Sequence, residues 1–268
     1  MAETKYIFIT GGASGIGREV ARYFAQRGWF VGLADVNAKG MEETAAMLPA
    51  GMSSLHSLDV RSREQWTSAL DAFAETSGGK LHVLFNNAGV GIGGLLEEHS
   101  EDDIEKLIDI NFKGVVYGAH IGHKYLKATP GSCLLNTSSA SGIYGSAGLS
   151  VYSATKFAVR GLTEALDIEW GPDGVRVRAL LPSFIDTPLL DGPVARTNQS
   201  SRDNVKAAGL EIAPVAIVAE AAWNAVHDAK NVHSYVGPTA KKLAFAAKWM
   251  PGSIRKRGGL IVRQQRGD

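Results

Sequence analysis

The sequence predicts a single α/β domain in which a parallel sheet of about seven strands is covered by helices on both faces. Short apolar runs rich in β-branched residues alternate along the chain with longer amphipathic segments. The runs are apolar on both faces, which is typical of strands in a buried parallel sheet. No repeat and no Pro/Gly/Ser-rich linker divides the 268 residues. One doubly wound α/β domain is therefore the expected architecture.

The elements follow in order from these two kinds of segment. Strands are expected where the runs are short and apolar, at KYIFIT (5–10), WFVGLAD (29–35), SLHSLDV (54–60), LHVLFNN (81–87), SCLLNTS (132–138), VRVRALL (175–181) and HSYVG (233–237). Helices are expected where apolar residues recur with a period of about 3.6. These segments are 15–27, 38–48, 62–77, 101–128, 151–170 and 214–229.

One long segment interrupts the alternation. From Pro182 to about Asn204 the chain is polar and irregular. A loop of that length in a compact domain is usually functional or mobile. We therefore expect a substrate loop at about 182–213, within a dinucleotide-binding catalytic domain formed by residues 1–240.

The C-terminal tail, residues 241–268, is strongly basic. It holds eight Lys or Arg and one acid, a net charge of +7, so residues 1–240 carry −6 of the total +1. Leu243, Ala246, Ala247 and Met250 fall on one helical stripe. We expect a docked helix with a solvated basic end rather than a separate domain. Closure over the active site, contact with a partner subunit and peripheral contact with an anionic membrane stay open.

Overall composition limits the function classes. Hydrophobic residues make up 45% and charged residues 21% of the chain, as in globular proteins with a large core. A net charge of +1 gives no field that would recruit nucleic acid. One cysteine, Cys133, excludes an internal disulfide and suits a reducing compartment. Neither a secretory signal nor a membrane span is visible, so a cytoplasmic location is expected, and no metal site is expected.

The first strand leads into TGGASGIG, residues 10–17, and then into a helix. Gly11 permits a tight turn, Gly15 lets a pyrophosphate approach the backbone, and Gly17 allows close packing of helix on sheet. The helix N-terminus offers N–H groups to the phosphates. A purely structural turn is the alternative. Because the glycines follow an apolar strand, the pattern favours a Rossmann-type nucleotide site.

An acid at the end of the second strand points to the kind of dinucleotide. Asp35 can bind both ribose hydroxyls of an adenosine and would repel a 2′-phosphate. The alternative is that Asp35 caps the helix over 38–48. Ser14 and Val36 supply no compensating positive charge, and Arg18 is the one cation nearby. NAD is therefore favoured over NADP.

Two further strand ends carry polar residues. Asp59 could accept a hydrogen bond from the adenine amino group, or it could simply cap the end of its strand. NNAG, residues 86–89, ends the fourth strand. Its small residues would let backbone lie against the adenosine ribose, and a plain turn is the alternative.

A phenol and an ammonium lie four residues apart in a predicted helix. Tyr152 and Lys156 therefore share one helical face. A base with a pKa near neutrality could remove the hydroxyl proton while a nicotinamide takes a hydride from the same carbon. A neighbouring ammonium lowers the pKa of a phenol in this way. The alternative for the tyrosine alone is a half-buried core residue.

With these motifs in place the chain resembles the short-chain dehydrogenase/reductase family over most of its length. TGGASGIG is similar to that family's cofactor loop, NNAG to its fourth-strand motif, and YSATK to its catalytic Tyr-x-x-x-Lys. Asn111 in DINFKG and Ser139 in NTSSASG fall at the family's other two catalytic positions. The resemblance implies that Ser139 holds the substrate oxygen, that Lys156 also reaches the nicotinamide ribose, and that Asn111 anchors a water in a proton relay.

The resemblance also implies the cofactor contacts. Expected NAD-binding residues are Gly11, Ser14, Gly15, Ile16, Gly17, Asp35, Asp59, Val60, Asn87, Ala88, Gly89, Tyr152, Lys156, Pro182, Ile185 and Thr187. Pro182-Ser183 stands where the family often has Pro-Gly, so the local turn is expected to differ. The family's short Asp-Gly-Gly strand, used in tetramer packing, is missing from this chain. A homodimer formed through helices 101–128 and 151–170 is expected, and a tetramer stays open.

The predicted function is an NAD-dependent dehydrogenase or reductase of a neutral, hydrophobic secondary alcohol or ketone, with Tyr152 as acid and base. The pocket walls are expected at 90–95, at 141–144 and at Phe184, Leu189 and Leu190, with no arginine facing inward. Alternatives are a non-catalytic NAD-binding sensor and an epimerase or dehydratase of the same fold that transfers a hydride transiently. A methyltransferase with a similar glycine loop would have no use for the Tyr-Lys pair.

Overall fold

The computed structural model of the chain describes residues 3–192, 194, 200–207 and 209–266. In this part of the chain seven parallel strands form one sheet, in the order β3-β2-β1-β4-β5-β6-β7. The strands are β1 (Tyr6–Thr10), β2 (Phe30–Asp35), β3 (Ser53–Ser57), β4 (Val83–Asn86), β5 (Cys133–Thr137), β6 (Arg176–Pro182) and β7 (His233–Val236). The predicted doubly wound, Rossmann-type α/β fold is confirmed.

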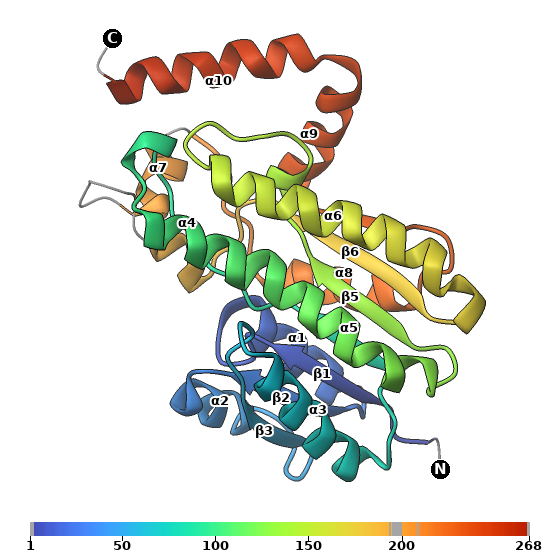
Figure 1. The fold of residues 1–268 in the computed structure, drawn as a ribbon. Coiled ribbons are helices and arrows are strands. Elements are labelled where there is room, and N and C mark those ends of the chain that lie inside the picture. The colour runs from blue at the N-terminus through green and yellow to red at the C-terminus, as the bar shows by residue number, and fades with distance from the viewer. Residues whose placement is uncertain (1–2, 193, 195–199, 208, 267–268) are drawn as a thin grey trace.

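Helices cover both faces of this sheet (Figure 1). They are α1 (Gly15–Ala25), α2 (Ala38–Ala45), α3 (Arg63–Ser77), α4 (Glu101–Ile108), α5 (Gly114–Lys127), α6 (Ser150–Trp170), α7 (Ser201–Ala207), α8 (Ala216–His227), α9 (Pro238–Trp249) and α10 (Pro251–Arg266). Strand order reverses between β1 and β4. In doubly wound sheets ligands bind at the carboxyl ends of the strands beside such a reversal.

Two apolar cores explain the continuous apolar runs of the strands. Ile7 and Ile9 of β1 belong to the core under α1 and α8, where they join Phe24. Phe8, between them, belongs to the opposite core with Trp66 of α3. Because successive side chains of a strand point to opposite faces, every residue of a doubly covered strand must be apolar.

The predicted strand at 54–60 ends earlier than expected. β3 is an edge strand that stops at Ser57. The Leu58 N–H still bonds the Asp35 carbonyl, but the Asp59 N–H is bonded by the Gln65 side chain of α3. That side-chain contact turns the chain away from the sheet, which leaves Asp59 two residues beyond the strand end.

The predicted helix at 101–128 consists of two α-helices joined by a π-helical turn, Asp109–Lys113. π turns inside helices occur frequently at functional sites. Within the predicted irregular segment the structure contains a 3₁₀ turn, η5 (Pro188–Asp191), and the helix α7. Parts of that segment, residues 193, 195–199 and 208, lie outside the described residues.

The basic tail forms the end of α9 and all of α10. Leu243 and Ala247 of the predicted stripe pack with Ala179 and Leu181 of β6. Met250 does not join them, because α9 ends at Trp249 and the Met250 side chain is exposed. Figure 1 shows α10 extending across the molecule above α7. None of the described helices is both long and apolar enough to span a bilayer.

Candidate active site

A large cleft opens at the carboxyl ends of the strands, with a cavity volume of about 1570 Å³. It brings together residues that are far apart in the sequence. The predicted site residues that line it are Gly11, Ser14, Gly15, Ile16, Asp35, Asp59, Val60, Asn87, Ala88, Gly89, Ser139, Tyr152, Lys156, Pro182, Ile185 and Thr187. Gly17 and Asn111 do not line the cleft, but each packs against a residue that does, Gly11 and Val90 respectively.

The glycine loop is shaped as the sequence predicts. Gly11 and Gly15 have φ of +70° and +51°, in the region that favours glycine. A Cβ on Gly17 would lie 2.1 Å from the Gly11 carbonyl oxygen, so only glycine allows α1 to approach the loop this closely. Ser14 stands at the N-cap of α1 without a side-chain capping bond, which leaves first-turn N–H groups for a ligand.

Asp35 does not cap α2, so that alternative is wrong. The N-cap is Asn37, whose side-chain oxygen accepts the Gly40 N–H at 3.0 Å. The Asp35 carboxylate instead accepts the N–H groups of Ala13 at 3.1 Å and of Asn37 at 3.0 Å. These two bonds hold the acid beside the glycine loop, where it lines the cleft.

Arg18, the cation near this acid, is engaged elsewhere. Its guanidinium donates to the Ala13 carbonyl at 2.6 Å and to Thr44 Oγ1 at 3.0 Å, and it pairs with Glu43 at 3.1 Å. The charge of Arg18 is therefore directed toward α2 and compensated there.

Asp59 also has a local partner. Its carboxylate accepts the Arg61 N–H at 3.0 Å and forms a 2.6 Å ion pair with the Arg61 guanidinium. Hydrogen bonding by Arg61 lowers the pKa of Asp59. The structure thus gives Asp59 the local capping role that competes with the predicted adenine contact, although the residue still lines the cleft.

The NNAG turn is fixed to the end of β1 by Thr10, a residue that the motif reading missed. Thr10 Oγ1 accepts the N–H groups of Asn87 and Ala88, both at 3.0 Å. The Asn87 side chain donates in turn to the Thr10 carbonyl at 3.0 Å. The turn is thereby placed against the glycine loop.

Asn111 is fully buried in the π turn and is paired with backbone. Its amide accepts the Val90 N–H at 2.8 Å and donates to the Val90 carbonyl at 2.9 Å. A Cβ on Gly89 would lie 3.1 Å from Asn111 Oδ1 and 3.6 Å from Lys156 Nζ. The asparagine therefore positions the segment that faces the lysine.

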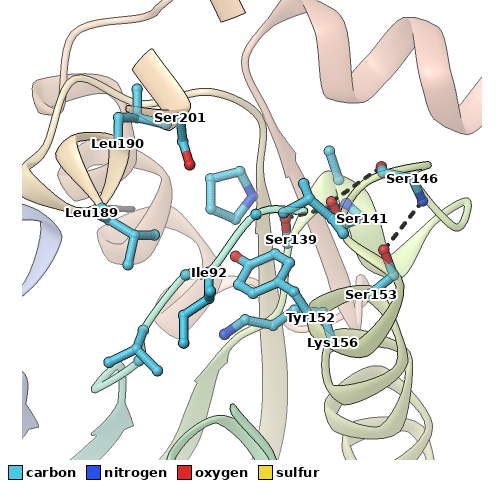
Figure 2. Close-up of a pocket in the computed structure, with 18 of the residues that line it drawn as sticks. Ile92, Ser139, Ser141, Ser146, Tyr152, Ser153, Lys156, Leu189, Leu190 and Ser201 are labelled. Carbon is cyan, nitrogen blue, oxygen red and sulfur yellow. Dashed lines mark hydrogen bonds between the residues drawn. The ribbon is translucent and has the colours of Figure 1, made fainter. Parts of the chain in front are cut away.

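Tyr152 and Lys156 extend from α6 in the same direction into the cavity, with Ser139 beside the phenol ring (Figure 2). Ser139 follows β5 and its hydroxyl accepts the Ser141 N–H at 3.1 Å. The Ser139 hydroxyl proton is thus left to donate toward an oxygen in the cavity. These three side chains come from two elements that the fold places next to each other.

Lys156 is the most buried charged group of the site, with 3% of its surface exposed. Its ammonium donates to the Thr137 carbonyl at 2.9 Å and lies 5.6 Å from the centre of the Tyr152 ring. Burial lowers the pKa of Lys156 to about 8. The ammonium keeps two further N–H groups for a ligand.

The Tyr152 hydroxyl does not yet have the acidity that its predicted role needs. Burial raises the pKa of Tyr152, and a hydrogen bond from Ser139 offsets part of that rise. The predicted lowering by Lys156 does not emerge from the arrangement of the protein groups themselves. Additional positive charge near the phenol is required to reverse the effect of burial.

The cavity walls are mostly apolar, as predicted, but include more of the chain. Residues 90–94, Ser141, Tyr144, Phe184, Leu189 and Leu190 line the cavity, whereas Leu95 and Ile143 do not. Ile143 instead packs against α9. The unexpected wall comes from the tail: Leu243 of α9 and Ile254 and Arg255 of α10 also line the cavity. Arg255 is exposed to solvent although it is part of the lining.

Arg202 is a second residue that the sequence did not reveal. From α7 it contacts Asp191 and Asp186, both at 2.6 Å, and donates to the Thr187 carbonyl at 3.1 Å. Hydrogen bonds to the two carboxylates raise the pKa of Arg202. The guanidinium thus fastens α7 to the segment that carries Thr187, over the glycine loop: a Cβ on Gly15 would lie 3.3 Å from the Thr187 side chain.

A short chain of serines supports the loop beside Tyr152 (Figure 2). The Ser146 N–H donates to Ser153 Oγ at 3.1 Å, and Ser146 Oγ lies 3.3 Å from Ser141 Oγ. Because Ser141 also donates to Ser139, these bonds link the start of α6 with the serine beside the phenol. No group of three or more His, Cys, Asp or Glu suited to a metal ion occurs among the described residues.

Comparison with known proteins shows the family to which the chain belongs. The family model described as short chain dehydrogenase matches residues 5–197. The chain belongs to the short-chain dehydrogenase/reductase family. It is 36% identical over 187 residues to a 3-alpha-(or 20-beta)-hydroxysteroid dehydrogenase of Mycobacterium bovis, covering 70% of this chain and 71% of that one. It is 32% identical over 231 residues to a meso-2,3-butanediol dehydrogenase of Serratia marcescens, covering 86% and 91%.

Two solved structures of the family extend the likeness to the cofactor. A short-chain dehydrogenase/reductase from Burkholderia phymatum in complex with NAD has a TM-score of 0.82 at 27% identity, covering 95% of each chain. An alcohol dehydrogenase from Thermococcus sibiricus complexed with 5-hydroxy-NADP has a TM-score of 0.75 at 27% identity, covering 87% of this chain and 96% of that one. These likenesses support an alcohol or ketone oxidoreductase with a nicotinamide cofactor.

Proposed function

We propose that this protein is an NAD-dependent dehydrogenase or reductase of a neutral, largely apolar secondary alcohol or ketone, acting in the cytoplasm with Tyr152 as acid and base. One observation carries the proposal. Ser139, Tyr152 and Lys156 meet in an apolar cavity whose other end is formed by the glycine loop and Asp35.

The residues present fit a dinucleotide. The glycine loop leaves no room for side chains at Gly11 and Gly17, whose Cβ atoms would lie 2.9 Å from Asn87 Nδ2 and 2.1 Å from backbone oxygen. The free first turn of α1 suits the pyrophosphate. Ile185, Thr187 and Lys156 would hold the nicotinamide half. When bound, the nicotinamide accepts or returns a hydride.

Asp35 supports NAD as the preferred cofactor. Its carboxylate is kept at the end of β2 by two backbone N–H groups. A 2′-phosphate in its place would meet this negative charge, and Arg18, already paired with Glu43, supplies no free cation to offset it. Two ribose hydroxyls, in contrast, can donate to the carboxylate.

The proton chemistry rests on Tyr152. In oxidation its phenolate takes the hydroxyl proton of the alcohol, and in reduction its phenol returns a proton to the ketone oxygen. The Ser139 hydroxyl holds that oxygen against the ring. Because burial alone raises the pKa of Tyr152, we infer that Lys156 and the positive charge of oxidised nicotinamide act together to stabilise the phenolate.

Lys156 would also orient the cofactor ribose and take part in the proton relay. One of its N–H groups is fixed on the Thr137 carbonyl, and the other two are free to meet ribose hydroxyls. The buried Asn111 lies near the same ammonium. Its main chain would anchor a water molecule, and that water would pass the proton outward. Its side chain is already committed to Val90, so the side chain serves positioning.

The cavity supports a bulky apolar substrate. Apolar residues of the substrate segment and of the tail helices line it together: Phe184, Leu189, Leu190, Leu243 and Ile254. Arg255 also lines the cavity, but it is exposed to solvent. A relative named as a hydroxysteroid dehydrogenase is consistent with a substrate of this size class.

A homodimer through α4, α5 and α6 belongs to the same proposal. An apolar groove lies between α4 and α6, lined by Ile104, Ile108 and Val151 among others. Ile108 and Phe157 are partly exposed and Ile168 is 79% exposed. Light scattering of Ile168→Asp together with Ile108→Asp is expected to give a monomer, and an unchanged mass would contradict this interface.

The decisive test is Tyr152→Phe. Turnover of a panel of secondary alcohols, followed as NADH absorbance, is expected to fall by about two to four orders of magnitude. NAD affinity, measured by calorimetry, should change little. Tyr117→Phe, which alters a tyrosine outside the cavity, is the matched control. If Tyr152→Phe keeps more than about a tenth of the rate, the assignment is wrong.

The same panel separates the alternatives. NAD binding by the unaltered protein without turnover of any alcohol or ketone would favour a sensor. NAD that stays bound through purification, with no net NADH, would favour an epimerase or dehydratase that returns the hydride to its substrate.

A further inference from the structure

The outer face of α9 combines aromatic and basic side chains. Lys241, Lys242, Phe245, Lys248 and Trp249 recur at spacings of three and four residues, so they share one helical face. Phe245 is 60% and Trp249 is 64% exposed, and the three lysines are exposed beside them. The Lys248 ammonium lies 4.9 Å from the centre of the Trp249 ring.

The apolar side chains on this face are not needed to hold the helix in place. The inner face of α9 already packs Ala240, Leu243 and Ala247 against Ile143 and β6. Large aromatic side chains left in water cost free energy that burial would recover. The outer face is therefore built for an occupant that accepts both apolar and positively charged groups.

The charge of the tail indicates which kind of partner this face can bind. No acid occurs between residues 241 and 267, although residues 1–240 carry −6. If two copies paired through this face about a twofold axis, each copy's lysines would be placed against those of the other. A surface with dense negative charge and an apolar layer just beneath it matches the face much better.

We propose that the outer face of α9, continued by the exposed Lys256 of α10, binds the surface of an anionic phospholipid membrane. Trp and Phe rings insert at the boundary between headgroups and acyl chains. Lysines beside them meet the phosphates and anionic headgroups, each contributing to a salt-sensitive attraction. The surface is peripheral, since no described helix can span the bilayer.

The helices that carry this surface also line the cleft, so membrane binding would bring the cleft close to lipophilic substrates. Leu243, on the opposite side of α9, and Ile254 of α10 line the cavity. If the proposed function holds, a lipophilic substrate can pass from the membrane into the cleft along α9 and α10. Membrane binding itself does not depend on that reaction and is tested without it.

The test is co-sedimentation of the full chain with vesicles of phosphatidylcholine alone and with about 30 mol% phosphatidylglycerol. The chain is expected to bind the anionic vesicles and to dissociate when NaCl is raised from about 0.05 to about 0.5 M. Lys241→Gln with Lys242→Gln should lower the partition coefficient about thirtyfold, at about fivefold for each lysine. Phe245→Ala with Trp249→Ala should lower it about tenfold or more.

Matched controls lie on other faces. Lys39→Gln with Lys230→Gln removes two exposed lysines, and Met47→Ala with Leu55→Ala removes two exposed apolar side chains. Both controls should bind like the unaltered chain. Equal binding to neutral and anionic vesicles, or equal loss in the control pairs, would overturn the proposal. A change of oligomeric state in lipid-free solution for Phe245→Ala with Trp249→Ala, with vesicle binding unchanged, would show a contact between copies instead.

Discussion

Replacing Lys156 with methionine is expected to stabilise the folded protein near neutral pH while abolishing turnover. Only 3% of the surface of Lys156 is exposed, and burial lowers its pKa from 10.5 to about 8. Keeping the proton on Lys156 in the fold at about pH 7 therefore costs about 3 kcal/mol. Methionine fills a similar volume and carries no charge.

Part of this gain is offset by a lost hydrogen bond. The ammonium donates to the Thr137 carbonyl at 2.9 Å, and such a charge-assisted bond contributes about 2 kcal/mol. The net expectation for Lys156→Met near pH 7 is an increase of about 1 kcal/mol in the free energy of unfolding.

The pH dependence gives the sharper measurement. Above pH 8 the folded protein loses the Lys156 proton, whereas the unfolded chain keeps it up to pH 10.5. The unfolded state then binds more protons, so the stability of the unaltered protein rises with pH in that window. Between about pH 7 and 9.5 this recovers about 2 kcal/mol, which the methionine variant cannot recover. Lys156→Met is thus expected to be the more stable protein at pH 7 and the less stable at pH 9.5.

Urea unfolding followed by tryptophan fluorescence, without added cofactor, measures both values. Lys230→Met, at an exposed lysine, is the matched control and should show little difference at either pH. A Lys156→Met protein whose stability relative to the unaltered chain is the same at both pH values would refute the reasoning, because the buried charge would then have no energetic cost.

Three further changes test other parts of the site. Asp35→Ser should shift the NAD-to-NADP ratio of kcat/KM toward NADP by about thirtyfold or more, because it removes the charge that opposes a 2′-phosphate; an unchanged ratio would contradict the role of the acid. Gly17→Ala places a Cβ 2.1 Å from a backbone oxygen and should cost about 1–3 kcal/mol in thermal unfolding, whereas Gly161→Ala, in an open part of α6, should be neutral or stabilising. Arg202→Gln frees α7 from Asp186 and Asp191 and should raise the substrate KM severalfold with little change in Tm; Arg22→Gln, at a surface pair, should leave KM unchanged.

Much of the fold follows from the sequence because its strands are buried on both faces. That burial requires continuous apolar runs, which are visible without a structure, and parallel pairing then places their carboxyl ends along one edge. The residues after those strands, among them Ser139 and Asp35, are consequently brought into one cleft. Helical spacing alone places Tyr152 and Lys156 together.

What the sequence did not reveal depends on contacts between distant segments. β3 stops at Ser57 because the Asp59 N–H, two residues further along the chain, donates to the side chain of Gln65 in α3. Arg202 becomes a clamp only when α7 folds back on η5. The wall supplied by Leu243 and Ile254 requires α9 to dock on β6, and helical periodicity does not say on what a stripe docks.

The acidity of the phenol depends on more than the spacing of the two residues. Spacing correctly brings the ammonium near Tyr152, at 5.6 Å from its ring. Burial of both groups, which no local pattern shows, raises one pKa and lowers the other. Helical spacing predicts that the two groups are close, whereas burial sets the direction in which the pKa of each group shifts.

The order of the chain adds a consequence to the way in which the cleft is walled. The residues proposed to bind the dinucleotide, from Gly11 to Thr187, precede α9 and α10 in the chain, and residues of these two helices line the same cavity. A chain cut after β7 is therefore expected to keep all of the proposed coenzyme contacts and to lose the apolar wall that Leu243 and Ile254 supply.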